Sequence, residues 1–272
     1  MIDIHTHILP NIDDGSKSIE ETFEIIKEAK KAGFDKIIST SHYMDGYYEV
    51  SKPEREVWLN AINENLEKQD IGIKLYLGNE IYMSENIIEF LKEEKATTLN
   101  DTNYVLFEMP LNAQPLNLYD IVYEMQEHKL LPILAHPERY SFVQKQPELI
   151  YELIQKGVLM QANYGSVIGQ YGTKAQIIVK RFLENNMIHF FGSDVHRKNT
   201  IYPEIPKIIK ELNDLVGTKK VEELTTVNPK MILENKRIEI EEPHKIELTF
   251  KEKVELTKGD SVNKRLKGIF KK

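Results

Sequence analysis

Short apolar runs alternate along the chain with segments whose apolar residues recur at helical spacing. The predicted strands are residues 2–5, 36–40, 74–79, 104–107, 131–135, 158–162 and 188–193. The predicted helices are residues 18–33, 53–69, 118–129, 148–156 and 171–186. Ser18 and Glu21 form the Ser-x-x-Glu pattern of a capping box at the start of the first helix. This alternation predicts an α/β fold with a parallel sheet.

A side chain that can bind a metal ion follows six of the seven predicted strands. These residues are His5, His42, Glu80, Glu108, His136 and Asp194, and Asn163 follows the remaining strand. They are spaced 27–38 residues apart, about one strand and one helix each. In a β/α barrel the carboxyl ends of all strands meet at one face, where barrel active sites lie. Scattered His, Asp and Glu are normally solvated, but this repetition favours one shared site.

The N-terminal motif His5-x-His7 gives a possible start for that site. Side chains alternate along a strand, so both imidazoles point to the same side. Two incidental histidines in a strand would produce the same pattern. The chain contains no cysteine, so any metal must be bound by His and carboxylate. That donor set suits Mn, Fe or Zn.

Composition limits the remaining functions. The 272 residues are enough for one large α/β domain or two small ones, and barrels of this length commonly form one domain. The net charge of -7 argues against general binding of nucleic acid. The chain has no apolar run near the ~18 residues of a membrane span and no signal-peptide pattern. We therefore expect a cytoplasmic protein without stable membrane insertion, either monomeric or a homo-oligomer.

Several motifs, in this order, resemble those of the PHP (polymerase and histidinol phosphatase) superfamily. They are His5-x-His7, the Asp14 loop, Ser41-His42, Gly78-x-Glu80, Phe107-Glu108, His136-Pro137-Glu138-Arg139 and Ser193-Asp194-x-His196. More closely, the first eight residues together with Asp13-Asp14-Gly15 resemble the CpsB/CapC-type bacterial protein-tyrosine phosphatases of polysaccharide loci. The resemblance covers residues 1 to about 233.

That resemblance implies a distorted (β/α)7 PHP barrel with a three-metal site at the C-terminal ends of its strands. The implied ligands are His5, His7, Glu80 and Asp194 for the first metal, Glu80, Glu108 and His136 for the second, and Asp14, His42 and His196 for the third. Glu80 would bridge two ions. The family implies Mn²⁺, and the ligand types also admit Fe or Zn.

The resemblance also implies hydrolysis of phosphotyrosine, with a bacterial tyrosine kinase of capsule or exopolysaccharide synthesis as the expected substrate. Hydroxide from metal-activated water would attack phosphorus, because a chain without cysteine cannot use a thiolate nucleophile. A small-molecule phosphatase of the histidinol-phosphatase type would share the metal centre but needs long enclosing loops. The third interpretation is a non-catalytic scaffold that binds metal.

Candidate substrate contacts lie close to these motifs. Arg139 is the candidate bidentate clamp for phosphate charge, and a surface salt bridge is the alternative. Family members often carry a second arginine after the Asp-x-His motif, and here Arg197 or Lys198 would take its place. Tyr43 and Tyr47 could flank the mouth and stack on a phosphotyrosine ring, or simply pack.

The C-terminal segment has a different composition. Residues 243–272 contain nine Lys or Arg against four Asp or Glu. We therefore predict a phosphatase barrel over residues 1–242 and a basic extension over 243–272 that is partly ordered or disordered. Residues 245–251 alternate like a strand. The basic residues 264–272 could favour an anionic membrane surface or form a terminus without such a role.

Overall fold

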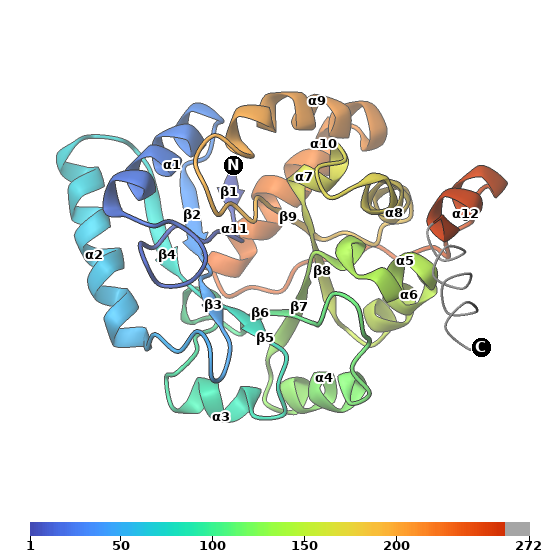
Figure 1. Cartoon of the computed structure of the whole chain (residues 1–272), viewed down its shortest axis with the longest axis horizontal. Helices are drawn as coiled ribbons and strands as arrows, with labels where there is room; N and C mark the ends of the chain where they lie inside the picture. The colour runs from blue at the N-terminus through green and yellow to red at the C-terminus, as the bar shows by residue number, and fades with distance from the viewer. Residues whose placement is uncertain (259–272) are drawn as a thin grey trace, which may run out of the picture.

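The computed structural model describes residues 1–258, which form a curled parallel sheet surrounded by helices (Figure 1). The strands are β1 (Ile2–Asp3), β2 (Lys36–Ser39), β3 (His42–Tyr43), β4 (Lys74–Leu77), β5 (Glu80–Tyr82), β6 (Tyr104–Glu108), β7 (Leu131–Ala135), β8 (Leu159–Asn163) and β9 (Phe190–Gly192). The α-helices are α1 (Ile19–Lys31), α2 (Lys52–Lys68), α3 (Ile87–Lys92), α4 (Leu118–Glu127), α5 (Ser141–Lys145), α6 (Glu148–Gln155), α7 (Tyr164–Val167), α8 (Thr173–Glu184), α9 (Ile205–Val216), α10 (Thr218–Glu222), α11 (Asn228–Leu233) and α12 (Phe250–Thr257). Short helical turns are η1 (Leu99–Asp101), η2 (Pro137–Arg139), η3 (Tyr202–Glu204) and η4 (Glu223–Val227).

The strands pair in parallel within two sheets. Their orders are β1-β2-β4 and β3-β5-β6-β7-β8-β9. The first and last strands meet through the parallel bridge between Thr6 and Val195, so the two sheets curl around one interior. This confirms the predicted α/β fold with a parallel sheet. The runs at 36–40 and 74–79 are each followed by a break, after which the chain continues into the other sheet.

Buried polar side chains hold these two breaks together. Arg55 of α2 is fully buried, and its Nη1 donates to the carbonyl of Gly78 at 2.9 Å. The next residue, Asn79, donates to the carbonyl of Ser41 at 2.6 Å. A Cβ atom at Gly78 would lie 2.8 Å from the Leu99 side chain and 3.2 Å from that of Ile38, so a larger residue requires these buried side chains to shift. The contacts fix the chain directly before His42 and Glu80.

The first helix begins as the sequence predicts. The Ser18 hydroxyl accepts a hydrogen bond from the Glu21 amide at 3.2 Å, which satisfies one free N–H of the first turn. Ile25, Ile26 and Ala29 bury the inner face of α1. In contrast, α8 begins two residues later than predicted, because Gly172 has a φ of 92° that no helix accommodates.

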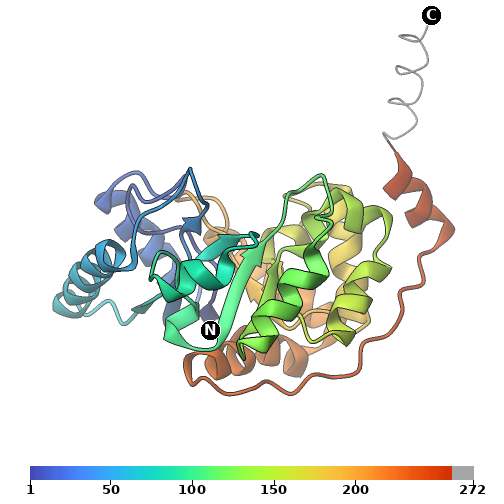
Figure 2. The same ribbon diagram turned by 90° about the horizontal axis from the view of Figure 1, so that it is seen from below.

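The C-terminal segment runs along the amino-end face of the barrel and then climbs its side to α12 (Figure 2). The strand predicted over 245–251 is wrong, because Thr249 and Glu252 form a capping box and α12 begins at Phe250. Nε and Nη2 of Arg181 each donate a hydrogen bond to the Glu252 carboxylate at 2.9 Å. The basic residues 264–272 lie outside the described residues, and the domain division at 242 stays a prediction. Among residues 1–258, no helix is both long and apolar enough to cross a membrane.

His189 is buried and directly precedes β9, at the amino end of this strand. Its Nδ1 accepts a hydrogen bond from the Met160 amide at 3.0 Å. Burial, with a smaller effect of Lys220, lowers the pKa of His189 to about 3. The folded protein therefore keeps this imidazole neutral between pH 3 and its ordinary pKa near 6.5.

We expect His189→Asn to reduce the acid sensitivity of the fold. Between pH 6.5 and 3 the unfolded chain binds one more proton than the folded chain, so each pH unit of acidification costs about 1.4 kcal/mol of stability. Asparagine retains an acceptor for Met160 and removes the proton uptake. Urea unfolding in chelator at pH 7 and 4.5 measures the difference. A variant that loses stability over this range as steeply as the wild type would contradict the assignment.

Candidate metal centre

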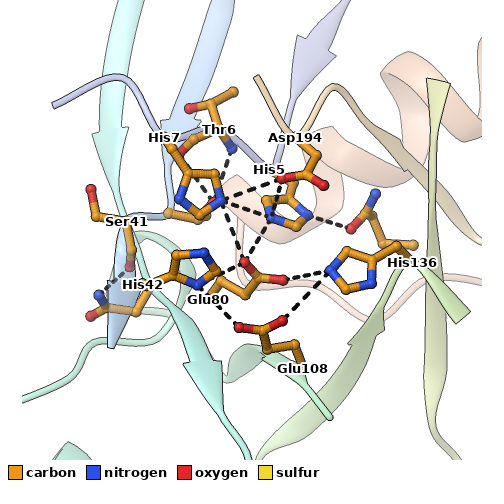
Figure 3. A network of polar contacts seen from close by, with 12 residues as sticks. His5, Thr6, His7, Ser41, His42, Glu80, Glu108, His136 and Asp194 are labelled. Atoms are coloured by element: carbon orange, nitrogen blue, oxygen red, sulfur yellow. Dashed lines mark hydrogen bonds and ion pairs between the residues drawn. The ribbon is translucent and has the colours of Figure 1, made fainter. Parts of the chain in front are cut away.

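Seven of the nine side chains predicted to bind metal converge at the carboxyl ends of the strands in Figure 3. His5 and His7 follow β1, His42 and Glu80 begin β3 and β5, Glu108 ends β6, His136 follows β7, and Asp194 follows β9. Glu80 lies at the centre of the group. His5, His7 and Glu80 have at most 1% of their surface exposed. Asp14 and His196 are more exposed and lie at the outer edge.

Hydrogen bonds orient three of the imidazoles. His5 Nδ1 lies 2.7 Å from Gln161 Oε1, His7 Nδ1 lies 2.7 Å from Asp13 Oδ2, and His196 Nδ1 lies 2.9 Å from the Asp194 carbonyl. We assign the Gln161 contact atom as the amide oxygen, and all three partners are then acceptors. In its neutral form each of these imidazoles therefore carries its hydrogen on Nδ1 and directs the lone pair of Nε2 inward. Such outer hydrogen bonds are typical of metal-binding histidines.

The inward-facing atoms fit a cation. Glu80 Oε2 lies 3.1 Å from His5 Nε2, 3.1 Å from His42 Nδ1 and 3.4 Å from His7 Nε2. It is buried and has no hydrogen-bond donor among the described residues. The Nε2 atoms of His5 and His7 face each other at 3.2 Å. Two lone pairs at that distance repel unless a proton or a metal ion lies between them, and mixed nitrogen and oxygen donors suit a divalent metal.

Three sets of these residues are close enough to hold an ion. The sets are His5, His7 and Glu80; His42, Glu80 and Glu108; and His7, Asp14, His42 and His196. They overlap with the sets that the family resemblance implies but are not identical. His42 joins the second set, while His136 Nε2 lies 2.9 Å from Glu80 and 3.9 Å from Glu108. Asp194 Oδ1 lies 3.6 Å from the Nε2 atoms of both His5 and His7.

The electrostatics of the centre favour bound cations. Burial lowers the pKa of His5, but the Glu80 and Asp194 carboxylates outweigh it and raise the pKa to about 9. Burial likewise opposes protonation of His42, and Glu80 and Glu108 raise its pKa to about 10. The same contacts hold the pKa of Glu80 well below its ordinary value despite burial. Metal binding must therefore displace protons, so affinity rises with pH.

The two candidate arginines differ in their surroundings. Arg139 Nη1 donates to Asp194 Oδ2 at 2.6 Å, directly beside the metal centre. Arg197 Nη1 donates to the carbonyls of Gly15 and His196 instead. Lys198 pairs with Glu24 on α1. Arg197 therefore ties down the loop that carries Asp14, and it has only its remaining N–H groups to offer to an anion.

The structure corrects one expected substrate contact. Tyr43 is 2% exposed and packs against Phe90, so its ring is not available to stack on a ligand at the mouth. Tyr43 follows His42 in β3, and because side chains alternate along a strand, His42 faces the site while Tyr43 points into the core. Tyr47 is 78% exposed, and the ring of Tyr48 stacks on His42 with centroids 5.7 Å apart.

Two orienting residues lie on β8: the sequence placed Asn163 at the end of this strand on the active face, but it gave no role to Gln161. Gln161 binds His5, and Asn163 Nδ2 donates to Asp194 Oδ2 at 2.7 Å. Gln161 and Asn163 are two positions apart, so both point into the barrel. Buried polar residues at alternate positions of an otherwise apolar strand were the available signal. This strand contributes no candidate metal ligand but orients two candidates, His5 and Asp194.

We expect Gly15→Ala to disrupt the outer part of the centre. A Cβ atom at Gly15 would lie 2.1 Å from the carbonyl oxygen of His7 and 2.6 Å from its Cβ. The loop must then move away from β1, taking Asp14 with it. We expect at least about 2 kcal/mol lower stability and clearly reduced metal content. Asp14→Ala is the comparison, since it removes the ligand without moving the backbone. Normal unfolding and normal metal content in Gly15→Ala would refute the steric argument.

A curled parallel sheet with clustered imidazoles and carboxylates at its carboxyl ends defines an α/β protein of the half-barrel type whose side chains are able to bind metal. The chain belongs to the CpsB/CapC family, whose profile, described as capsular polysaccharide synthesis, CpsB/CapC, matches residues 1–234.

Known proteins of this family resemble the chain over most of their length. It is 34% identical to CapC of Staphylococcus aureus over 241 residues, covering 88% of this chain and 93% of CapC. It is 32% identical to the tyrosine-protein phosphatase YwqE of Bacillus subtilis, again covering 88% and 93%. The chain also resembles a solved structure from work on YwqE of Bacillus subtilis and CpsB of Streptococcus pneumoniae, which are described there as unique metal-dependent tyrosine phosphatases. The match covers 91% of this chain and 100% of the chain in that structure. Its identity is 30% and its TM-score 0.85.

Proposed function

We propose that this chain is a metal-dependent protein-tyrosine phosphatase. The observation that carries the proposal is the position of Glu80, whose Oε2 lies within 3.4 Å of imidazole nitrogens from three histidines. Such a group supplies the cationic centre that a phosphate dianion requires. The absence of cysteine removes the thiolate alternative. The names of the full-length relatives support phosphotyrosine as the substrate.

The chain's own residues divide the chemistry between them. A cluster of three ions in a seven-unit PHP barrel would be held by nine side chains, and Mn²⁺ is the metal that the family resemblance implies. These side chains are His5, His7, Asp14, His42, Glu80, Glu108, His136, Asp194 and His196. Bound ions of this kind neutralise phosphoryl oxygens and lower the pKa of water. Arg139 supplies N–H donors to the charge that develops on phosphate. A phenolate leaving group, with an ordinary pKa near 10, needs little protonation help from the protein.

The mouth of the site suits a tyrosine presented by another protein. Tyr47 in the loop after β3 is 78% exposed, and Leu116 in the loop after β6 is fully exposed. These loops rise at the carboxyl end of the barrel (Figure 2). The two loops, residues 44–51 and 109–117, thus present exposed apolar side chains that can contact the residues flanking a phosphotyrosine. A kinase that controls capsule or exopolysaccharide synthesis is the proposed partner.

Phosphate release from a tyrosine-phosphorylated peptide and from histidinol phosphate tests the proposal. Chelated protein is assayed alone and after addition of Mn²⁺, Fe²⁺ or Zn²⁺. We expect metal-dependent turnover of the peptide and a loss of roughly 100-fold in Arg139→Ala. Preference for histidinol phosphate would replace the substrate class. No turnover of either compound, with metal bound, would refute the phosphatase proposal.

A further inference from the structure

The guanidinium of Arg139 lies between a carboxylate and an aromatic ring. Its Nη1 donates to Asp194 Oδ2 at 2.6 Å, and its Cζ lies 4.4 Å from the ring centroid of Tyr171. Within residues 1–258 the guanidinium makes no other hydrogen bond. The Arg139 side chain is 23% exposed. Since arginine has five N–H donors, most of them remain available to an anion.

Asp194 connects this arginine to the metal centre. One carboxylate oxygen, Oδ1, lies 3.6 Å from the Nε2 atoms of His5 and His7. The other, Oδ2, accepts hydrogen bonds from Arg139 and Asn163. Asp194 therefore holds one nitrogen of the guanidinium next to the place where a phosphoryl group would bind. The orientation of the guanidinium plane depends on the residue that covers its face, which is Tyr171.

The connection between α7 and α8 is built to place Tyr171 on that face. A Cβ atom at Gly165 would lie 2.4 Å from Gln170 Oε1 and 3.1 Å from Tyr171 Cε2. Glycine at this position thus allows the turn to fold down onto α7. Gly172, with its φ of 92°, then turns the chain into α8 directly after the tyrosine. Tyr171 is held by backbone geometry on both sides.

The ring interacts with Arg139 as a neutral aromatic group. Burial and the Asp194 carboxylate raise the pKa of Tyr171 above its ordinary value, so the phenol keeps its proton at neutral pH. A cation over the face of a neutral tyrosine is stabilised by the ring quadrupole. The contact with the ring also restricts the guanidinium, which ends a long side chain with many rotamers.

Other cations near the centre are engaged elsewhere. Arg197 Nη1 binds the carbonyls of Gly15 and His196. Lys198 pairs with Glu24 on the outer face of the barrel. This leaves Arg139 with the most free donors of the three cations, so the orientation of its plane bears directly on phosphate binding.

We propose that Tyr171 is a positioning residue that holds the Arg139 guanidinium toward the phosphoryl group of the substrate. This inference rests on the proposed phosphatase function. Tyr171 acts through Arg139 and touches neither the phosphoryl group nor a metal ion. Its ring, and not its hydroxyl, provides the effect, so phenylalanine can replace it and leucine cannot.

A double-mutant cycle on the full chain loaded with Mn²⁺ tests this role. The proteins are wild type, Tyr171→Leu, Arg139→Ala, the double variant and Tyr171→Phe. The readouts are kcat/KM for the phosphotyrosine peptide, the Kd of inorganic phosphate by calorimetry, and metal content. Tyr119→Leu is the matched control, because Lys156 lies 5.2 Å from the Tyr119 ring on the outer surface.

We expect Tyr171→Leu to lower kcat/KM and phosphate affinity roughly tenfold. The same change in the Arg139→Ala background should cost less than about twofold, and Tyr171→Phe should retain most activity. Metal content stays normal in all five proteins. Equal losses in both backgrounds, or a loss of metal, would overturn the positioning role. Tyr171-dependent phosphate binding without peptide hydrolysis would keep that role and reject phosphotyrosine as the substrate.

Discussion

Glu80→Gln is expected to abolish both metal binding and phosphatase activity while leaving the barrel folded. The substitution keeps the shape of the side chain but replaces an anionic oxygen that lies within 3.4 Å of His5, His7 and His42. Loss of a residue that only orients a ligand typically costs 10- to 100-fold. Glu80 belongs to two of the three potential ion sets, so we expect metal affinity and kcat/KM to fall roughly 1,000-fold.

Glu138→Gln is the matched control for this prediction. Glu138 is also fully buried at the same end of the barrel, where its Oε1 accepts from Ser166 at 2.6 Å and from the Asn163 amide at 3.0 Å. Burial raises the pKa of Glu138, and glutamine keeps an Oε1 acceptor for both donors. Metal content and kcat/KM of both variants decide the matter. A Glu80→Gln protein that keeps its metal and a tenth of its activity would exclude Glu80 as the central ligand.

The sequence was sufficient to place the candidate metal-binding side chains at one end of the sheet, because the ends of apolar strands are easy to identify. An apolar run of four or five residues that stops at His or Glu has few interpretations in a parallel sheet. His5, Glu80 and His136 could therefore be placed on one face without knowledge of packing. The breaks after β2 and β4 could not be predicted, since an interrupted strand keeps the same apolar pattern as a continuous one.

Side chains whose role depends on packing could not be assigned in this way. Tyr43 was expected at the mouth, but its position in β3 directs the ring against Phe90 in the core. Tyr171 was not singled out because its contact with Arg139 depends on the glycine-dependent turn between α7 and α8. Gln161 looked like one polar residue in an apolar strand. Its hydrogen bond to His5 joins residues 156 positions apart, which no local pattern reveals.

Metal-free protein is expected to lose stability as the pH rises above neutrality. In the folded chain the pKa of His5 is about 9 and that of His42 about 10, whereas both are near 6.5 in the unfolded chain. Between these values the folded state binds more protons, so the stabilisation is complete below pH 6.5 and disappears as the pH passes 9 to 10. His5 alone corresponds to about 3 kcal/mol.

Bound metal should remove this dependence, because divalent ions occupy the position of those protons between the imidazoles and Glu80. The gap in stability between loaded and chelated protein should therefore widen from pH 6.5 to 9. Urea unfolding with chelator or with saturating Mn²⁺ measures both curves. Glu80→Gln supplies the control, since without the carboxylate the histidine pKa values return toward normal and the chelated curve flattens. A chelated wild type equally stable at pH 6.5 and 9 would show that the charge network around Glu80 does not form.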